Sequence, residues 1–273
     1  MLVGFIFFGF GCWAWGSPAS ENASVGYTSY GLLFGGTKLP DRGPGFVRAR
    51  PGESTRFGTD ELVGLVGRAA AAVARAYPGS ALLRVGDLSG PSGGRHPRHG
   101  SHRVGRDVDL IFYVTDAMGR TTRGRGWLAF DRFGVAREPS MDAHDGAIFF
   151  FDDARNWHLV RTMVLDPEAH VQWIFVSQGI KARLLAYGAA HESDPEALFR
   201  AAWVLHQPLR GNPHADHFHV RIACTTRQKM LGCIDRKPQW PWMRKELEKG
   251  TFVADSTLTD RSLTTILVGG EER

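Results

Sequence analysis

Residues able to bind a metal ion lie in two segments that are far apart in the chain. The first segment contains His102 and Asp109, and the second contains His217 and His219. Alternate side chains of a strand point to the same face, so His217 and His219 can converge on one point. One ion can join both segments only if the fold places them side by side. This requirement constrains the fold more than any other feature of the sequence.

The residue types in these segments predict a zinc site with hydrolytic chemistry. Two imidazoles and one carboxylate are a common ligand set for Zn²⁺, and they leave one position of a tetrahedral ion open. Water at an open position has its pKa lowered to about 7 and becomes a nucleophile at neutral pH. The alternative is coincidence, since the chain contains 11 histidines and some fall at such spacings by chance. The combined order His, Asp, His-x-His is more specific than either motif alone, so we expect one Zn²⁺ per chain.

Apolar periodicity predicts both strands and helices. Alternating or short apolar runs predict strands at residues 81–85, 107–112, 171–176 and 217–222. Helical spacing predicts helices over residues 60–77, 152–164 and 195–205. We also expect residues 127–130 and 134–137 to form a hairpin about a turn containing Asp131. The predicted fold class is α+β, with a central, largely antiparallel sheet flanked by helices.

Several motifs around the candidate ligands resemble those of the penicillin-insensitive murein endopeptidases. This family belongs to the wider group of lysostaphin-type, D-alanyl-D-alanine and hedgehog-like zinc peptidases. The motifs are Ser24-Val25-Gly26, Gly36 to Pro40, Val85-Gly86-Asp87, Gly93-Gly94, Ile174-Phe175-Val176, Ile180-Lys181 and His214 to Arg221. The likeness covers roughly residues 24 to 235. It implies a fold of the hedgehog and D-alanyl-D-alanine peptidase type.

The resemblance also implies roles for individual histidines. It makes His102, Asp109 and His219 the zinc ligands. His217 and His214 then become catalytic, with His217 as general base and His214 as its partner or as a donor to the oxyanion. The alternative for His214 is that it only orients a ligand.

Three further residues are expected at the margin of the site. His99 matches a family histidine that lines the site, although it could instead only orient a ligand. Asp107 lies on the strand face of Asp109, where it could orient an imidazole, contact a substrate amine, or simply be solvated at the strand end. Arg103 belongs to a basic group that could either bind the carboxylates of a peptide stem or be solvated. The other members of this group are Arg95, Arg98 and Arg106.

The implied activity is hydrolysis of peptide cross-links in bacterial peptidoglycan, at the bond between D-alanine and meso-diaminopimelate. The related D-alanyl-D-alanine carboxypeptidases have Glu and Ala where this chain has His214 and Asp107. Both departures favour the endopeptidase. Two alternatives stay open: a carboxypeptidase of the same fold, and a non-catalytic, zinc-stabilised domain that binds the cell wall. Peptide stems of peptidoglycan are the expected partner, and nucleic acid is not, because no recognition motif or interleaved aromatic platform is present.

The N-terminal residues indicate export. Residues 1–19 combine an apolar stretch with following small residues, which is typical of a signal peptide or N-terminal anchor, although a positive n-region is missing. We expect a periplasmic or exported protein with one zinc peptidase domain over residues 20–245 and a C-terminal tail over 246–273. No later stretch is apolar enough for an integral membrane domain. The oligomeric state is not predicted.

Cysteine usage and charge agree with an extracytoplasmic wall enzyme. Once Cys12 is set aside, Cys224 and Cys233 remain as an even pair, which suits an oxidising compartment. The family has a cysteine pair at this place, so the resemblance implies a disulfide. A spacing of Cys-x8-Cys is not typical of zinc ligands. The formal net charge of +5 favours anionic surroundings such as a bacterial wall.

Overall fold

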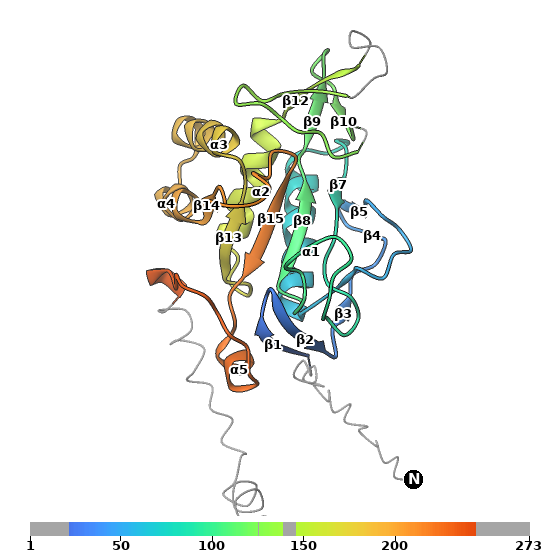
Figure 1. The fold of residues 1–273 in the computed structure, drawn as a ribbon. Coiled ribbons are helices and arrows are strands. Elements are labelled where there is room, and N and C mark those ends of the chain that lie inside the picture. Colours follow the sequence, from blue (N-terminus) through green and yellow to red (C-terminus); the bar gives the residue numbers. More distant parts are fainter. Residues whose placement is uncertain (1–21, 125, 139–145, 244–273) are drawn as a thin grey trace, which may run out of the picture.

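A seven-stranded sheet forms the centre of the molecule (Figure 1). The structure is a computed structural model that describes residues 22–124, 126–138 and 146–243. In spatial order the strands are β14 (Leu205–His206), β13 (Val171–Phe175), β15 (His217–Ile222), β8 (Asp107–Ile111), β7 (Leu83–Val85), β5 (Phe46–Arg48) and β4 (Arg42–Gly43). Four of the six neighbouring pairs are antiparallel. The prediction of an α+β fold with a largely antiparallel central sheet is therefore confirmed.

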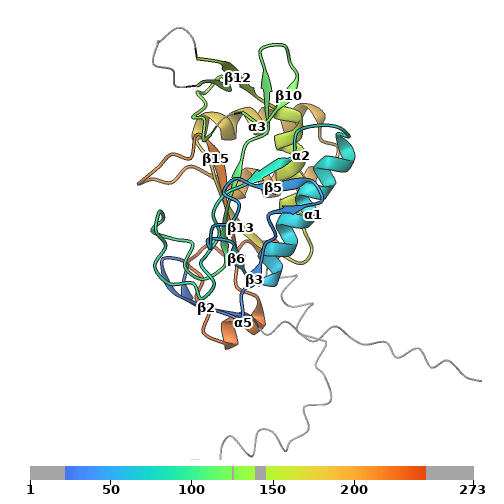
Figure 2. The same ribbon diagram turned by 90° about the vertical axis from the view of Figure 1, so that its right-hand side faces the viewer.

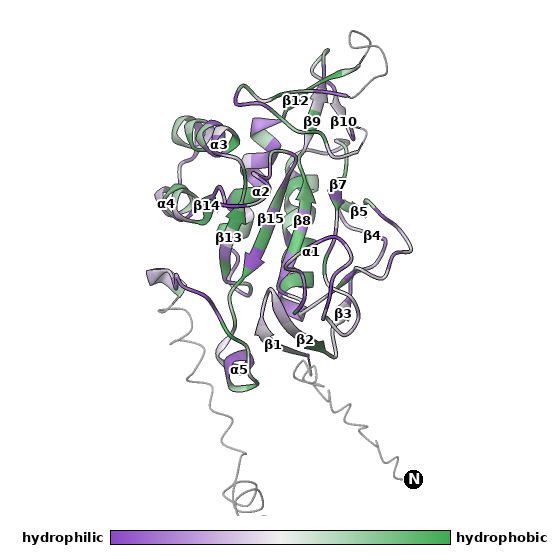
Figure 3. Cartoon of the chain, in the orientation of Figure 1, coloured by the Kyte–Doolittle hydropathy of each residue, from purple (hydrophilic) through white to green (hydrophobic). Residues whose placement is uncertain are grey.

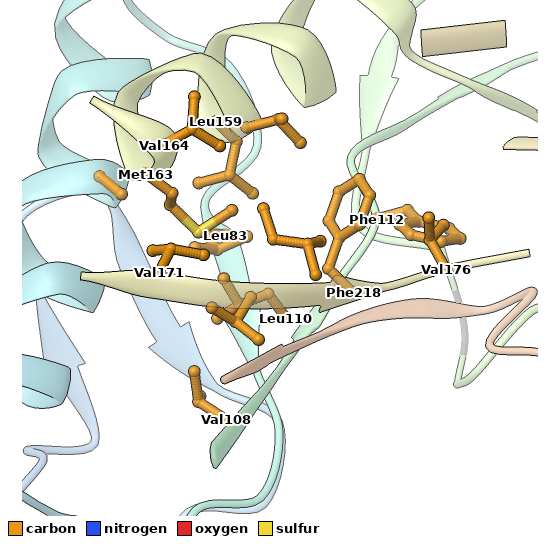
Figure 4. Packing of buried hydrophobic residues seen from close by; sticks show 14 of the residues in the cluster. Leu83, Val108, Leu110, Phe112, Leu159, Met163, Val164, Val171, Val176 and Phe218 are labelled. Carbon is orange, nitrogen blue, oxygen red and sulfur yellow. The ribbon is translucent and has the colours of Figure 1, made fainter. Parts of the chain in front are cut away.

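Helices cover one face of this sheet, as two perpendicular views make clear (Figures 1 and 2). These helices are α1 (Asp60–Ala76), α2 (Asp153–Val164), α3 (Gln178–His191) and α4 (Pro195–Val204); the short helix α5 (Thr226–Met230) lies instead beside strand β1 (Ala23–Tyr27). Figure 4 shows Leu159 and Met163 of α2 packing toward Leu110 and Phe218 of the sheet. Along β8 and β15, hydrophobic residues alternate with hydrophilic ones, and Figure 3 shows both characters on these strands. Because alternate side chains point to opposite faces, the polar ones lie on the face away from α1 and α2.

Three of the helices begin and end close to where the sequence predicts, whereas α3 was not among the predicted helices. Helix α1 begins after Thr59, whose side chain accepts a hydrogen bond from the backbone N–H of Leu62. It ends before Pro78 and Gly79, and Gly79 has a φ of +76°, which glycine adopts without a steric cost. The predicted bounds of α1, α2 and α4 differ from the observed ones by one residue at most.

The predicted hairpin between residues 127–130 and 134–137 is wrong. Strand β11 (Val135–Arg137) pairs instead with β12 (Ile148–Phe151) in a four-stranded sheet that also contains β9 (Val114–Asp116) and β10 (Thr121–Thr122). The turn does form, because the Asp131 carboxylate accepts hydrogen bonds from the N–H groups of Phe133 and Val135. The N–H of Phe130 donates to the carbonyl of Ala215, in the loop before β15. Residues 127–130 are thus held against that loop and not against β11.

Two small two-stranded sheets complete the fold near the end of the central sheet where β8 begins. Strand β1 (Ala23–Tyr27) pairs with β2 (Tyr30–Phe34), and β3 (Thr37–Lys38) pairs with β6 (Phe57–Gly58). Gly26 of β1 exchanges backbone hydrogen bonds with Gly232 and Ile234, which follow α5. Within the described residues, no helix combines the length and the apolar character needed to cross a membrane. The predicted leader at 1–19, Cys12 and the tail at 246–273 lie outside the described residues.

Cys224 and Cys233 form the predicted disulfide, with the sulfur atoms 2.09 Å apart. The bond closes a loop between two cysteines nine positions apart, directly after β15. We expect the double substitution Cys224→Ser and Cys233→Ser to lower the free energy of unfolding by about 2.5 kcal/mol, because the unfolded chain regains the freedom of that loop. Urea unfolding with and without a reducing agent measures this. The reducing agent should shift the midpoint of the parent protein and not that of the variant; equal midpoints for parent and variant would contradict a stabilising bond.

Candidate functional site

The two segments that carry the candidate ligands are neighbouring strands. β8 and β15 run antiparallel, and their register places His219 directly opposite Asp109. Both side chains are buried and lie on the polar face of the sheet, opposite the core side chains Phe218 and Leu110. The alternation of polar and apolar residues therefore places the ligands on one side of the sheet and the core on the other.

The loop between β7 and β8 brings His102 to the same place. His102 is fully buried and has a φ of +60°, a conformation that is uncommon for a residue other than glycine. Flanking hydrogen bonds hold this turn: the N–H of Arg103 donates to the carbonyl of Thr28, and the N–H of Gly94 donates to the carbonyl of Arg103. At Gly93, with a φ of +67°, a Cβ atom would lie 2.1 Å from the Arg103 carbonyl oxygen. The loop thus requires glycine where it passes the histidine turn.

Three ligand atoms form a nearly equilateral triangle. His102 Nε2 lies 3.2 Å from Asp109 Oδ1 and 3.3 Å from His219 Nδ1, and the third side of the triangle measures 3.4 Å. In a tetrahedral zinc site with bonds of about 2.0–2.1 Å, neighbouring ligand atoms are about 3.3–3.4 Å apart. Both oxygens of Asp109 are buried, and neither has a hydrogen-bond partner among the described residues. The cluster therefore fits a single small cation and could hold one.

A second carboxylate orients the His219 ring. Asp107 Oδ1 lies 2.9 Å from His219 Nε2, which leaves Nδ1 directed toward Asp109, and it also accepts a hydrogen bond from Arg221 at 2.6 Å. Burial alone would raise the pKa of Asp107, but Arg221 and His219 hold it well below its usual range. A carboxylate behind a ligand imidazole fixes the ring and its tautomer. Asp107 is fully buried, so it is not a solvated residue at a strand end.

His217 lies beside the ligand cluster and has its own carboxylate partner. Its Nε2 atom is 3.4 Å from Asp109 Oδ1, and its Nδ1 atom is 2.7 Å from Asp216 Oδ1. Burial would lower the pKa of His217, but the neighbouring carboxylates of Asp109 and Asp216 raise it to about 9. The Trp127 ring meets the imidazole edge-on, with centroids 4.9 Å apart. The ring is thus held with Nε2 facing the ligand cluster.

His214 lies on the same side of the site as His217, and its pKa is shifted in the opposite direction. Its ring centroid lies 5.0 Å from that of His217 and 5.4 Å from that of His219. Burial and the neighbouring His217 lower the pKa of His214 to about 4. Two adjacent titratable groups whose pKa values move apart are typical of acid and base roles in one site.

His99 and Asp87 form the other wall of the site. His99 Nε2 lies 3.1 Å from Asp87 Oδ2 and 3.4 Å from Asp109 Oδ2. Asp87 is fully buried and also pairs with Arg98 and Arg50. Burial would raise the pKa of Asp87, but its hydrogen bonds to His99 and Arg98 hold it well below its usual range. Because Asp87 is already neutralised by guanidinium groups, it is a poor ligand for a second cation.

Comparison with known proteins identifies the family to which this arrangement belongs. The family model described as penicillin-insensitive murein endopeptidase matches residues 24–245, which include every side chain of the cluster. The chain belongs to the penicillin-insensitive murein endopeptidase family. It is therefore similar in sequence to peptidases that act on murein, and the sequence-based recognition is confirmed.

Two curated members of the murein endopeptidase family match at moderate identity. The chain is 28% identical over 224 residues to the penicillin-insensitive murein endopeptidase of Klebsiella pneumoniae subsp. pneumoniae, a match that covers 80% of this chain and 72% of that protein. It is 25% identical over 228 residues to the protein of the same name from Yersinia enterocolitica, covering 80% and 71% respectively.

The structure gathers nearly all the site residues expected from the family resemblance. Besides the three candidate ligands, His217, His214, His99 and Asp107 line the same cluster. Arg103 does not: it lines a separate cavity beside the β1–β2 hairpin.

The grouping of four arginines as one stem-binding patch is wrong for two of them. Arg98 pairs with Asp87 and Glu53. Arg106 is buried and pairs with Asp235 at 2.6 Å. Arg106 is thus taken up within the protein, whereas Arg98 is exposed but already has two acidic partners.

Asp216, Asp87 and Trp127 are site residues that the sequence did not reveal. Asp216 adjoins His217 in the motif, and this adjacency is the one signal that could have indicated a partner for the imidazole. Asp87 belongs to a recognised motif, but its contacts to His99 depend on the folded loop. Trp127 lies in the segment that was assigned to the incorrect hairpin.

Glycine is required at position 86, where Trp127 approaches the ligand cluster. A Cβ atom at Gly86 would lie 2.5 Å from the Trp127 ring and 3.1 Å from the Asp109 Cβ atom. We expect Gly86→Ala to destabilise the protein by about 1–3 kcal/mol through overpacking and to weaken metal binding. The matched control is Gly67→Ala in α1, where a Cβ atom meets nothing within 4 Å and alanine favours the helix. Thermal unfolding and metal titration compare the two variants, and an unperturbed Gly86→Ala protein would contradict the close approach.

Proposed function

We propose that the protein is a zinc-dependent murein endopeptidase that hydrolyses peptide cross-links of bacterial peptidoglycan, at the bond between D-alanine and meso-diaminopimelate. The observation that carries this proposal is the triangle of His102 Nε2, Asp109 Oδ1 and His219 Nδ1, whose sides match the spacing of tetrahedral ligands. Family membership supports murein as the substrate.

The ligand set supports zinc as the metal. Two imidazoles and one carboxylate suit Zn²⁺, and the buried oxygens of Asp109 have no hydrogen-bond partner among the described residues. When bound, zinc supplies positive charge to polarise the scissile carbonyl and lowers the pKa of the attacking water. A cation at Asp109 also offsets the negative charge that raises the pKa of His217, so the imidazole shifts toward the neutral form that a base needs.

His217 is the proposed proton carrier. Asp216 accepts a hydrogen bond from Nδ1–H, so Nε2 is free to take a proton from the attacking water and return it to the leaving amine. His214, which stays neutral near pH 7, is placed to donate a hydrogen bond to the developing oxyanion. Asp107 positions His219, and His99 adds a donor beside Asp109.

The alternatives are less well supported. A carboxypeptidase of this group would have glutamate as base where the chain has His214, whose ring lies beside those of His217 and His219. A domain that uses zinc only for stability has no need of the hydrogen-bonded pair of Asp216 and His217 facing the ligands. Both alternatives make distinct predictions for products and turnover.

The remaining expectations belong to the same proposal. We infer one catalytic domain over residues 20–245 of the hedgehog and D-alanyl-D-alanine peptidase type, which the family match over 24–245 supports. We infer export to the periplasm by a leader or anchor at 1–19, and the disulfide between Cys224 and Cys233 suits such an oxidising compartment. Peptide stems of peptidoglycan are the proposed partner.

Digestion of purified, cross-linked dimeric muropeptides tests the proposal together with metal analysis. We expect one zinc per chain, conversion of dimers to monomers, loss of activity with a chelator, and recovery when zinc is restored. Release of only a terminal D-alanine would indicate a carboxypeptidase. A protein that contains zinc, binds muropeptides and leaves them intact would indicate a binding domain.

A further inference from the structure

Two arginines of the loop that carries His102 have charges that no described residue neutralises. Arg98 and Arg106 of the same loop pair with acids, but Arg95 and Arg103 make no ion pair with any residue that the structure describes. The Nε atom of Arg103 is buried and has no hydrogen-bond partner among these residues. A buried guanidinium nitrogen without an acceptor is costly unless a ligand supplies one.

Both arginines line a cavity of about 520 Å³, which we call the hairpin cavity. Its other walls come from the β1–β2 hairpin and Gly94, and the lining residues besides the arginines are Val25, Gly26, Tyr30, Gly31, Leu32 and Gly94. Tyr30 and Leu32 are 79% and 48% exposed, so they present apolar surface to the cavity and to solvent. The cavity therefore combines an apolar wall with two positive charges.

Glycine keeps the hairpin close to the loop. A Cβ atom at Gly31 would lie 2.0 Å from the Val25 carbonyl oxygen and 2.6 Å from Val104. The N–H of Gly94 donates to the carbonyl of Gly31 and, at 2.8 Å, to that of Arg103. The hairpin cavity is thus a built feature that backbone hydrogen bonds hold together.

One residue that lines the hairpin cavity directly follows, in the chain, a residue of the ligand cluster. Arg103 directly follows His102, and the positive φ of His102 turns the chain so that His102 meets Asp109 while Arg103 lines the cavity. Figure 1 shows the hairpin beside the loop that precedes β8. The same turn of the loop therefore supplies one residue to the ligand cluster and the next to the cavity.

We propose that the hairpin cavity binds a free carboxylate of the murein peptide stem through Arg95 and Arg103, and that this contact positions the cross-link at the metal cluster. The proposal rests on the proposed function and deepens it. Guanidinium groups recognise carboxylates with paired, charge-assisted hydrogen bonds. The apolar wall of Val25, Tyr30 and Leu32 suits the aliphatic side chains of such a stem.

Removing either charge should weaken substrate binding and leave the chemical step intact. We expect Arg95→Met and Arg103→Met each to raise KM by roughly tenfold or more, with kcat little changed, because each removes hydrogen bonds to a charged group. The matched control is Arg42→Met, an exposed arginine of β4 that does not line the hairpin cavity. Tyr30→Ser tests the apolar wall, since this exposed side chain can change without altering the core.

The substrate comparison isolates the carboxylate. Dimeric muropeptides whose stem carboxylates are amidated should show a raised KM with the parent protein and Arg42→Met. The two arginine variants should discriminate less between amidated and free substrates. Unchanged KM values in both variants, or equal discrimination in all proteins, would overturn the proposal.

Direct binding separates this inference from the proposed activity. The uncross-linked stem tripeptide of L-alanine, D-glutamate and meso-diaminopimelate should bind the chelator-treated full chain, and Arg95→Met and Arg103→Met should weaken that binding by roughly tenfold or more. Because this measurement does not depend on turnover, it tests carboxylate binding independently of hydrolysis. Inorganic phosphate that binds as tightly as the tripeptide would indicate a general anion site and would overturn carboxylate recognition.

Discussion

Replacing Asp109 with asparagine is expected to abolish metal binding and to lower murein hydrolysis by several orders of magnitude. Asp109 Oδ1 lies within 3.2 Å of His102 Nε2 and 3.4 Å of His219 Nδ1 and is the only carboxylate oxygen in the triangle. A neutral amide cannot offset the charge of a divalent cation between two imidazoles. The measurement is zinc content per chain together with the rate of dimer cleavage.

Stability gives a second measurement for Asp109→Asn that is independent of activity. A metal at 100 times its Kd stabilises the native state by about 2.7 kcal/mol, so zinc should raise the Tm of the parent protein and leave that of the variant unchanged. The quantity compared is the zinc-dependent rise in Tm of each protein, because loss of the Asp109 carboxylate beside His102 and His217 also changes the stability of the metal-free protein. A variant that keeps one tightly bound zinc would rule out Asp109 as a ligand.

Asp107→Asn is the graded control for this experiment. Asp107 orients His219 and is not itself in the triangle, so its loss should weaken metal affinity by roughly 10–100-fold and not abolish binding. Equal losses in both variants would indicate general damage to β8.

The sequence predicts the central part of the fold well because local pattern and ligand geometry agree there. The segments 107–112 and 217–222 alternate as strands, and the ligands on them can meet only if the strands are neighbours, as β8 and β15 are. The same alternation places His219 and Asp109 on one face, whereas their register is set by the folded sheet. Segment 127–130 had no such long-range constraint. Its apolar pattern did not indicate that Phe130 would bond to Ala215.

The site shows the same division between local and long-range information. His217 and His219 could be recognised because they share one motif, whereas the contact of Asp87 with His99 depends on the path of the loop before β8. Arg106 and Arg103 look alike in the sequence. In the fold, Arg106 is buried against Asp235, while Arg103 lines a cavity whose described walls contain no acidic residue. Burial and pairing of charged side chains are set by tertiary contacts that the residue type alone does not encode.

His217→Ala is expected to retain one zinc per chain and to lower kcat by roughly 10²–10⁴-fold, the usual contribution of a positioned general base. His217 Nε2 lies 3.4 Å from Asp109 Oδ1, close enough to exchange a proton with water in the site, but it is not part of the ligand triangle. His191→Ala, at an exposed histidine stacked on Tyr187 outside the site, serves as the control and should keep full activity. Single-turnover cleavage of dimeric muropeptides by zinc-loaded proteins measures the effect.

Asp216→Asn distinguishes a proton carrier from a merely structural histidine. Asp216 is one of the two carboxylates that raise the pKa of His217, so its neutralisation should lower that pKa. A base must be unprotonated to act, and the acid limb of the pH–rate profile should therefore move to lower pH, while kcat on the plateau falls because the ring loses its orienting partner. A structural role for His217 predicts no shift of that limb. If His217→Ala retains both zinc and full turnover, the metal serves a binding domain, and the hydrogen-bonded pair with Asp216 has no catalytic role.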